Sequence, residues 1–212
     1  MSDEFTAEPV PAEAIAVFGE RLPLAEKYAE LLARDGDLLG LIGPRELPKI
    51  WSRHILNSAV VSDLVNPGER VADVGSGGGL PGIPMAIRAP EAKFTLIEPM
   101  ERRAKWLAEV VVPTLRLANL EVLRCRAEEA PVDAYEVVTA RAVSALPKLL
   151  KMLVPLAGPQ GRILALKGSK ATEEIEAAKP LAEKLRLGNF EIVTVGQKLL
   201  KEPTTVVRIG LL

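Results

Sequence analysis

The chain of 212 residues has a mass of 22.8 kDa, which suits one compact domain with a small extension. Its net charge of −1 and its pI near 6.0 exclude the globally basic balance of a general nucleic-acid binder. Cys125 is the single cysteine and His54 the single histidine, which excludes an internal disulfide and predicts no metal site.

The N-terminal part of the chain predicts helices. Residues 1–10 form a frayed lead-in without a signal-peptide pattern, and no apolar run approaches a membrane span, so we expect a cytoplasmic protein with no membrane partner. Apolar residues recur at helical spacing from Ala12 to Ala33, and Pro23 should divide this stretch into two helices. After a loop rich in glycine and leucine, Lys49–Leu64 predicts another helix.

After a turn at residues 66–68, short strands alternate with helices. The strands are predicted at Arg70–Val74, Lys93–Ile97, Leu120–Leu123, Glu136–Thr139, Arg162–Leu166, Phe190–Val195 and Thr204–Ile209, and the helices at Pro81–Ala89, Met100–Ala118, Ser144–Ala157 and 170–186. This alternation predicts an α/β fold with a Rossmann-like parallel sheet, and the last two strands an antiparallel hairpin, which is the layout of class I methyltransferases. We therefore expect an N-terminal helical cap over residues 1–65 and an α/β domain over residues 66–212.

The stretch ERVADVGSGGGLPGIPMAIR, residues 69–88, holds the most informative motif. Gly75, Gly77 and Gly79 follow the first strand directly, and glycine lets a ligand contact the backbone. Residues 77–82 also match G-x-G-x-x-G, a pattern of dinucleotide sites, so NAD is one candidate ligand.

Other residues favour S-adenosylmethionine (AdoMet) over NAD. Asp73 leads the loop, and an acid there suits a cationic part of a ligand, whereas Pro81 and Pro84 remove N–H donors that a pyrophosphate would need. Glu98 ends the second strand and can accept both hydroxyls of a ribose, which NAD and AdoMet share. Arg126–Glu129 follows the third strand, beside the same crevice, where an adenine ring would lie. Together, these pieces predict an AdoMet site.

Five motifs occur in the order found in one known family. They are RHILNS (Arg53–Ser58), DVGSGGGLPGIP (Asp73–Pro84), RAEE (Arg126–Glu129), TARAVSAL (Thr139–Leu146) and LALKG (Leu164–Gly168). From about residue 45 onward the chain resembles the RsmG family, also called GidB, and GLPGIP is the most specific part of the resemblance. The resemblance implies a class I fold with a helical cap, AdoMet as donor, and methylation of N7 of a guanine in bacterial 16S ribosomal RNA. It also implies AdoMet contacts at Gly75, Leu80, Ala127, Glu128 and Arg141.

The implied chemistry agrees with the residues at the strand ends. Guanine N7 carries an exposed lone pair, so its methylation needs alignment of the reactants and no general base. Arg141 and Lys167, at the ends of the fourth and fifth strands, are positioning candidates. Arg141 can orient the AdoMet carboxylate or a phosphate, and it can also form an ion pair with Glu128 or Asp73. Lys167 can hold an RNA phosphate or be a solvated lysine.

Because the net charge is −1, RNA binding requires a local cationic patch. The RNA-binding candidates are Arg53, His54, Arg102, Arg103 and Lys167. His54 can instead be a packed histidine. Trp51 and Trp106 have apolar neighbours at helical spacing, which favours core packing over base stacking. Cys125 is expected to be a small buried filler.

Three alternatives share parts of this pattern. A methyltransferase for another RNA site or a small molecule would use the same cofactor site, and an NAD-dependent oxidoreductase would use the same glycine loop. A non-enzymatic ribosome-assembly factor would retain the fold alone. The expected partner remains 16S ribosomal RNA, within the small ribosomal subunit or its precursor.

Overall fold

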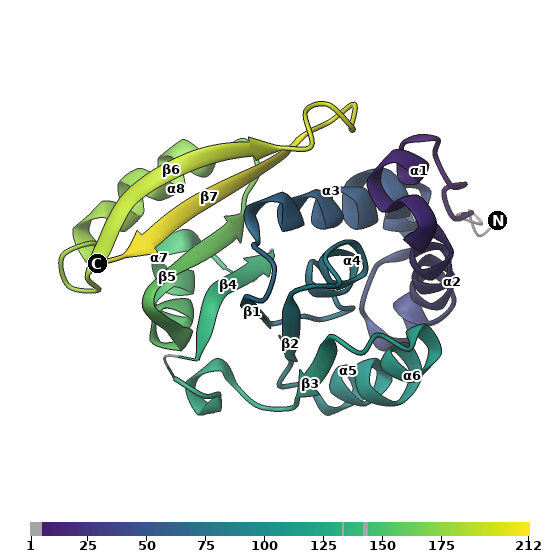
Figure 1. Cartoon of the computed structure of the whole chain (residues 1–212), viewed down its shortest axis with the longest axis horizontal. Helices are drawn as coiled ribbons and strands as arrows, with labels where there is room; N and C mark the ends of the chain where they lie inside the picture. The colour runs from purple at the N-terminus through teal and green to yellow at the C-terminus, as the bar shows by residue number, and fades with distance from the viewer. Residues whose placement is uncertain (1–5, 133, 142–143) are drawn as a thin grey trace.

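A single seven-stranded sheet organises the computed structural model, which describes residues 6–132, 134–141 and 144–212 (Figure 1). The strands are β1 (Arg70–Val74), β2 (Lys93–Ile97), β3 (Leu120–Leu123), β4 (Tyr135–Arg141), β5 (Ala157–Leu166), β6 (Leu187–Val195) and β7 (Thr204–Leu211). Their order is β3-β2-β1-β4-β5-β7-β6, with β1 to β5 parallel and β7 antiparallel to both β5 and β6. The predicted parallel sheet with a C-terminal antiparallel hairpin is confirmed.

The strand order places a topological switch between β1 and β4. From β1 the chain moves outward to β2 and β3, then returns to the other side of β1 at β4. In doubly wound sheets, ligands bind where such a reversal opens a crevice at the carboxyl ends of the strands. The register pairs Asp73 with Thr139 and Ala140 with Ala165, so β1, β4 and β5 end at the same edge.

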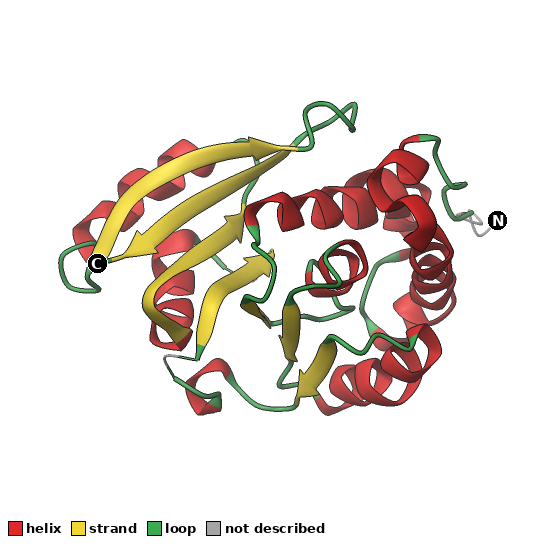
Figure 2. Cartoon of the chain, in the orientation of Figure 1, coloured by secondary structure: helices red, strands yellow, loops and turns green. Residues whose placement is uncertain are grey.

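Helices cover both faces of the sheet. They are α1 (Glu13–Phe18), α2 (Leu22–Leu39), α3 (Leu56–Ala59), α4 (Gly82–Arg88), α5 (Glu101–Lys105), α6 (Val112–Leu115), α7 (Leu146–Leu153) and α8 (Ala171–Ala178). Side chains alternate between two hydrophobic clusters: Val71 and Val137 pack with α1 to α4, whereas Ala72 and Val138 pack with α7 and α8. In Figure 2 the N-terminal helices and the β6–β7 strands lie at opposite sides of the view. Within the described ranges, no helix has the length and apolar content to cross a membrane.

The N-terminal helices differ from the predicted pattern in three ways. Pro23 does not break a helix, because it lies in the first turn of α2, where a missing N–H costs no hydrogen bond. The break falls at residues 19–21 and begins at Gly19, whose φ is 53°. The helix α2 then continues through the expected loop to Leu39 and ends at Gly40, whose left-handed conformation suits a helix terminus.

Residues 6–12 are anchored rather than frayed. The Glu8 backbone N–H donates to the Leu47 carbonyl at 2.9 Å, and its carboxylate accepts the N–H groups of Trp51 and Ser52, both at 2.9 Å. Those two N–H groups begin the continuous helical stretch 50–64, whose first turn is a π-helix (Ile50–Ile55). The cap and the sheet share one hydrophobic cluster, and the domain boundary between residues 65 and 66 stays a prediction.

Candidate active site

The glycine loop leaves β1 in a conformation that few other residues adopt. Gly75, Gly77 and Gly79 have φ values of 71°, 57° and 90°, a region that penalises side chains with a Cβ. A Cβ on Gly79 would also lie 2.2 Å from a side-chain carbon of Ile83 in α4. The backbone therefore needs glycine at these positions for its own shape, before any ligand is considered.

Asp73 holds this loop from below. Its Oδ2 accepts the Gly82 N–H at 3.0 Å, and a Cβ on Gly82 would lie 2.7 Å from the same oxygen. The side chain is fully buried, which raises the pKa of Asp73 to about 7, and its Oδ1 has no hydrogen-bond partner among the described residues. The sequence suggested a contact with a cationic part of a ligand, whereas here the carboxylate joins the end of β1 to the start of α4.

Glu98 links the loops that follow β1 and β2. It is 2% exposed, and its two carboxylate oxygens accept the N–H groups of Gly77 and Met100, both at 2.8 Å. Each carboxylate oxygen has two acceptor sites, so both oxygens retain capacity for a hydroxyl donor. A role in binding a ribose stays a prediction that this geometry permits.

Two cavities follow the carboxyl edge of the sheet and share Gly75, Pro99 and Met100 in their walls. The larger, of 850 Å³, is lined by Ala127 and Glu128, and the smaller, of 440 Å³, by residues of the glycine loop. Of the predicted cofactor residues, Gly75, Gly77, Leu80, Glu98, Ala127, Glu128 and Arg141 line one cavity or the other. We call the two cavities together the cofactor groove. Gly79 is the predicted residue outside its walls, and it packs toward α4 instead.

Arg141 ends β4 and lines the smaller cavity of the cofactor groove. Its Nη2 lies 2.7 Å from Nδ1 of His54, and its Nη1 donates to the Arg53 carbonyl at 3.4 Å. His54 Nε2 lies 2.8 Å from Oε2 of Glu46. Burial first, and then the charge of Arg141, lower the pKa of His54 to about 4, so the imidazole is neutral at pH 7. Glu46, which no motif indicated, completes this chain of hydrogen bonds.

Tyr28 in α2 supports the glycine loop and is, after Glu46, the second residue of the site that no sequence motif indicated. Its hydroxyl donates to the Gly78 carbonyl at 2.7 Å, and its side chain is fully buried. Burial raises the pKa of Tyr28, so the phenol stays protonated and keeps its donor. A tyrosine on the apolar face of a predicted helix needs a partner for its hydroxyl, and that was the available signal.

The cationic candidates separate into two groups. Arg103 lines the smaller cavity and donates to the Gly40 carbonyl at 2.7 Å, while Arg102 and Arg53 are exposed, the latter paired with Glu46. Lys167 is instead held away from solvent: its Nζ lies 2.8 Å from both the Ser144 carbonyl and Oε2 of Glu174.

His54 is 9% exposed and both of its ring nitrogens have partners, so a direct contact with RNA would require its hydrogen bonds with Glu46 and Arg141 to break. Contacts of these cations with RNA stay predictions. Trp51 and Trp106 are 2% and 5% exposed, which confirms core packing. Cys125 is half-buried and lines the larger cavity, so its prediction as a buried filler is wrong. Burial raises the pKa of its thiol.

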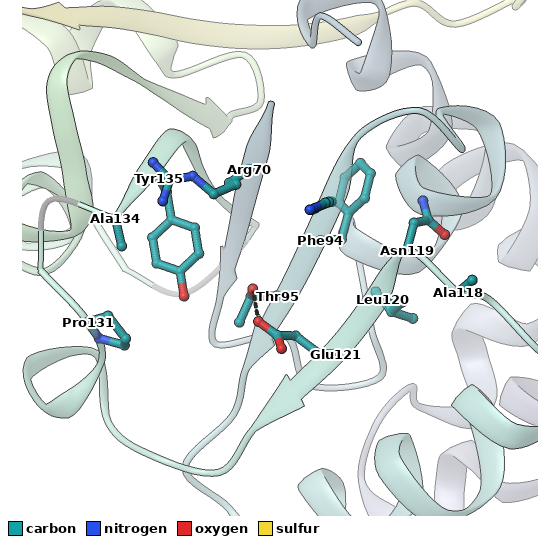
Figure 3. Close-up of a pocket in the computed structure, with 11 residues that line it drawn as sticks. Arg70, Phe94, Thr95, Ala118, Asn119, Leu120, Glu121, Pro131, Ala134 and Tyr135 are labelled. Atoms are coloured by element: carbon teal, nitrogen blue, oxygen red, sulfur yellow. Dashed lines mark hydrogen bonds between the residues drawn. The ribbon is translucent and has the colours of Figure 1, made fainter. Parts of the chain in front are cut away.

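A further cavity of 360 Å³ lies at the opposite edge of the sheet, among the first residues of β1 to β4 (Figure 3). Thr95 donates to Glu121 at 2.7 Å inside it, and Tyr135 and Arg70 form part of its wall (Figure 3). None of the predicted site residues lines this cavity. It also lies at the amino ends of the parallel strands, whereas ligands of such folds bind at the carboxyl ends.

Comparison with known proteins assigns the family. Residues 21–202 match the family GidB, described as rRNA small subunit methyltransferase G. The chain belongs to this family. Ribosomal RNA small subunit methyltransferase G of Arthrobacter sp. (strain FB24) is 54% identical over 211 residues, covering 99% of this chain and 96% of that protein. The protein of the same name from Rhodococcus jostii (strain RHA1) is 51% identical over 203 residues, covering 93% and 88%.

Solved structures with low sequence identity share the fold. The TYW2 protein of P. horikoshii in complex with MeSAdo has a TM-score of 0.56 and 16% identity, covering 73% of this chain and 61% of that one. The tRNA (m1A58) methyltransferase TrmI of Aquifex aeolicus has a TM-score of 0.55 and 15% identity, covering 73% and 68%. These structures show the class I fold, and the family match identifies the chain as an AdoMet-dependent methyltransferase, as the resemblance implied.

Proposed function

We propose that this chain transfers the methyl group of AdoMet to N7 of a guanine in 16S ribosomal RNA. The observation that supports this most directly is the cofactor groove, which gathers the glycine loop, Glu98 and Arg141 at the switch point of the sheet in a member of this family. AdoMet, when bound, supplies an electrophilic methyl group on a sulfonium. The protein itself must bind AdoMet and the guanine, align N7 with the methyl group, and prevent other orientations of the two reactants.

The groove fits AdoMet in the chemistry of its walls. Exposed backbone at Gly75 and Gly77 allows close approach of a ligand, and the buried Glu98 carboxylate can accept ribose hydroxyls. Ala127 and Glu128 line the larger cavity, on the side expected for the adenine ring. Arg141 provides a cation for a carboxylate at the other end, lining the smaller cavity with the glycine loop.

A reaction without a general base agrees with the state of the titratable groups near the groove. The imidazole of His54 is neutral but bound on both sides, and Asp73 is buried beneath the loop. Lys167 is bound to Glu174. Attack by the N7 lone pair needs none of these groups as a base, so Arg141 is proposed to act by position and charge, whereas the pairing of Lys167 with Glu174 argues against such a role for Lys167.

We further propose that the substrate is an assembled or partly assembled small subunit in the cytoplasm. The net charge of −1 leaves little long-range attraction for free RNA. Arg53, Arg102 and Arg103 are the cations that we expect to contact phosphates. So small a patch should rely on the folded particle for specificity.

Mass mapping of 16S ribosomal RNA from cells that lack this protein tests the proposal. One guanine should lose a methyl group, and purified protein with labelled AdoMet should restore it, more efficiently on small subunits than on naked transcript. An unchanged methylation map would refute the assignment. Equal turnover on transcript and subunit would refute the particle as substrate and leave the reaction in place.

A further inference from the structure

We infer that Glu46 and His54 are positioning residues that hold Arg141 toward the cofactor groove, so that the N-terminal helices help to set the affinity for AdoMet. This inference rests on the AdoMet site described above and adds two residues of the cap to it. Glu46 and His54 are 8 positions apart in the sequence, whereas Arg141 lies 87 positions after His54.

Hydrogen-bond chemistry fixes which group donates and which accepts in the series of hydrogen bonds from Arg141 through His54 to Glu46. A guanidinium has N–H donors and no acceptor, so His54 Nδ1, at 2.7 Å from Arg141 Nη2, must accept. The proton of the neutral imidazole then lies on Nε2, which donates to Glu46 at 2.8 Å. Glu46 thereby selects the tautomer that Arg141 requires. A protonated imidazole would place an N–H against an N–H and break the contact.

Burial and the neighbouring charges stabilise these protonation states of Glu46, His54 and Arg141. Burial and the charge of Arg141 lower the pKa of His54 to about 4. Burial alone would raise the pKa of Glu46, but the hydrogen bond from His54 and the charge of Arg53 lower it overall. Burial lowers the pKa of Arg141, and the negative charges of Asp73 and Glu46 oppose this effect. Glu46 therefore stays anionic, His54 neutral and Arg141 cationic across the physiological range.

Arg141 needs such support because an unbound guanidinium would have a competing partner. The charge of the buried Asp73 acts on it, and within the described part of the chain the Oδ1 atom of Asp73 has no hydrogen-bond partner. With Nη2 bound to His54 and Nη1 to the Arg53 carbonyl, the guanidinium is held along the wall of the smaller cavity. Loss of His54 would free the side chain to rotate away from this position.

Calorimetric titration of the full chain with AdoMet, without RNA, tests this inference in a double-mutant cycle. We expect Arg141→Ala to bind at least about 30-fold more weakly and His54→Phe, which keeps the ring volume, about 10-fold more weakly. In the Arg141→Ala background, His54→Phe should add less than about twofold. Equal losses in both backgrounds, or unchanged affinity in a folded His54→Phe variant, would overturn the inference.

A matched pair at Glu46 separates positioning from folding. Glu46→Gln keeps an acceptor for the His54 N–H and should stay within about threefold of the wild type, whereas Glu46→Leu removes the acceptor and should lose about fivefold or more. The neighbouring Arg45→Ala is the control and should bind as the wild type does. Equal affinities for Gln and Leu would contradict the acceptor role. Wild-type protein that fails to bind AdoMet would contradict the proposed function instead, so the two failures are distinguishable.

Discussion

The carboxylates of Glu69 and Asp73, near the two ends of β1, have opposite environments. At the amino edge, Arg162 pairs with Glu69 through two hydrogen bonds of 2.8 and 2.6 Å, and the bond from Arg162 lowers the pKa of Glu69 to about 2. At the carboxyl edge, Asp73 is buried, one of its oxygens has no partner in the ranges that the structure describes, and burial raises its pKa to about 7. The Glu69 carboxylate therefore has a full ion pair, whereas one oxygen of the Asp73 carboxylate retains unused capacity to accept a hydrogen bond.

This difference separates stability from function. The ion pairs at the amino edge join Arg162 of β5 to Glu69, the residue before β1, and Arg70 of β1 to Glu136 of β4, and they favour the folded chain. Unsatisfied groups and glycines with positive φ at the carboxyl edge cost stability, and such strain concentrates where ligands bind. The amino-edge cavity of 360 Å³ is therefore a gap between strand starts, whereas the cofactor groove is lined by groups that a ligand can complete.

The largest expected effect breaks the carboxyl edge at the glycine loop. Gly75→Val places a branched side chain at a φ of 71° and in the wall shared by both cavities. We expect AdoMet affinity to fall at least 100-fold, or about 3 kcal/mol, while the circular dichroism spectrum stays that of a folded α/β protein. The control is Gly43→Ala, because a Cβ added at Gly43 would lie in open space. Wild-type affinity in Gly75→Val would mean that the loop does not contact the cofactor.

The next effect breaks the amino edge. Arg162→Ala leaves the carboxylate of Glu69, which is 15% exposed in its side chain, without its cation. The free energy of unfolding should fall by about 3 kcal/mol, and AdoMet affinity should stay unchanged. The Arg70–Glu136 pair on the same edge is 53% and 42% exposed, so Arg70→Ala should cost less than about 1 kcal/mol. Denaturant titration measures both, and equal costs would contradict the role given to burial.

A smaller effect compares Asp73 and His54 by pH. The pKa of His54 falls from 6.5 to about 4 on folding, so its stability contribution is present above 6.5 and is lost as the pH falls. The pKa of Asp73 rises from 3.8 to about 7, so its contribution is present below 3.8 and is lost as the pH rises. Between about pH 5 and 6.5 the two slopes oppose each other, each at most about 1.4 kcal/mol per pH unit.

Single substitutions should reveal the two slopes. The stability of Asp73→Asn should rise with pH across this window, and the stability of His54→Phe should fall, while the wild type stays nearly flat. Denaturant titrations at several pH values measure the three curves. Parallel curves for all three proteins would contradict the opposed roles of the two groups.

The smallest effect concerns RNA. We expect log affinity for single-stranded RNA to fall with log salt at a slope of about −2 to −3.5, from roughly three to five phosphate contacts. Arg53→Ala and Arg102→Ala should each reduce the slope by somewhat less than about 1. Lys167→Ala should leave it unchanged, because the Lys167 side chain is 8% exposed and already bound to Glu174. A slope that responds to Lys167 alone would place the RNA on the β5 side of the groove.

Local sequence pattern alone determined the sheet and the glycine loop. The bounds of β1, β2 and β3 are those predicted, because a short apolar run with flanking turn residues defines a buried strand locally. The glycines at 75, 77 and 79 also allow the positive φ observed there, since glycine adopts that region without a steric cost. The motif order then indicated the family and the cofactor.

Tertiary structure decided what each polar side chain does. Glu46, His54 and Arg141 meet only because the cap folds onto the end of β4, and Lys167 is bound by Glu174 from the following helix. The position of the break near Pro23 depended on whether that residue opens a helix or interrupts one, and in the structure Pro23 opens α2 after a break at Gly19–Arg21. A short-range pattern records which backbone a residue prefers, whereas the partner of a buried charge depends on chain segments far away in the sequence.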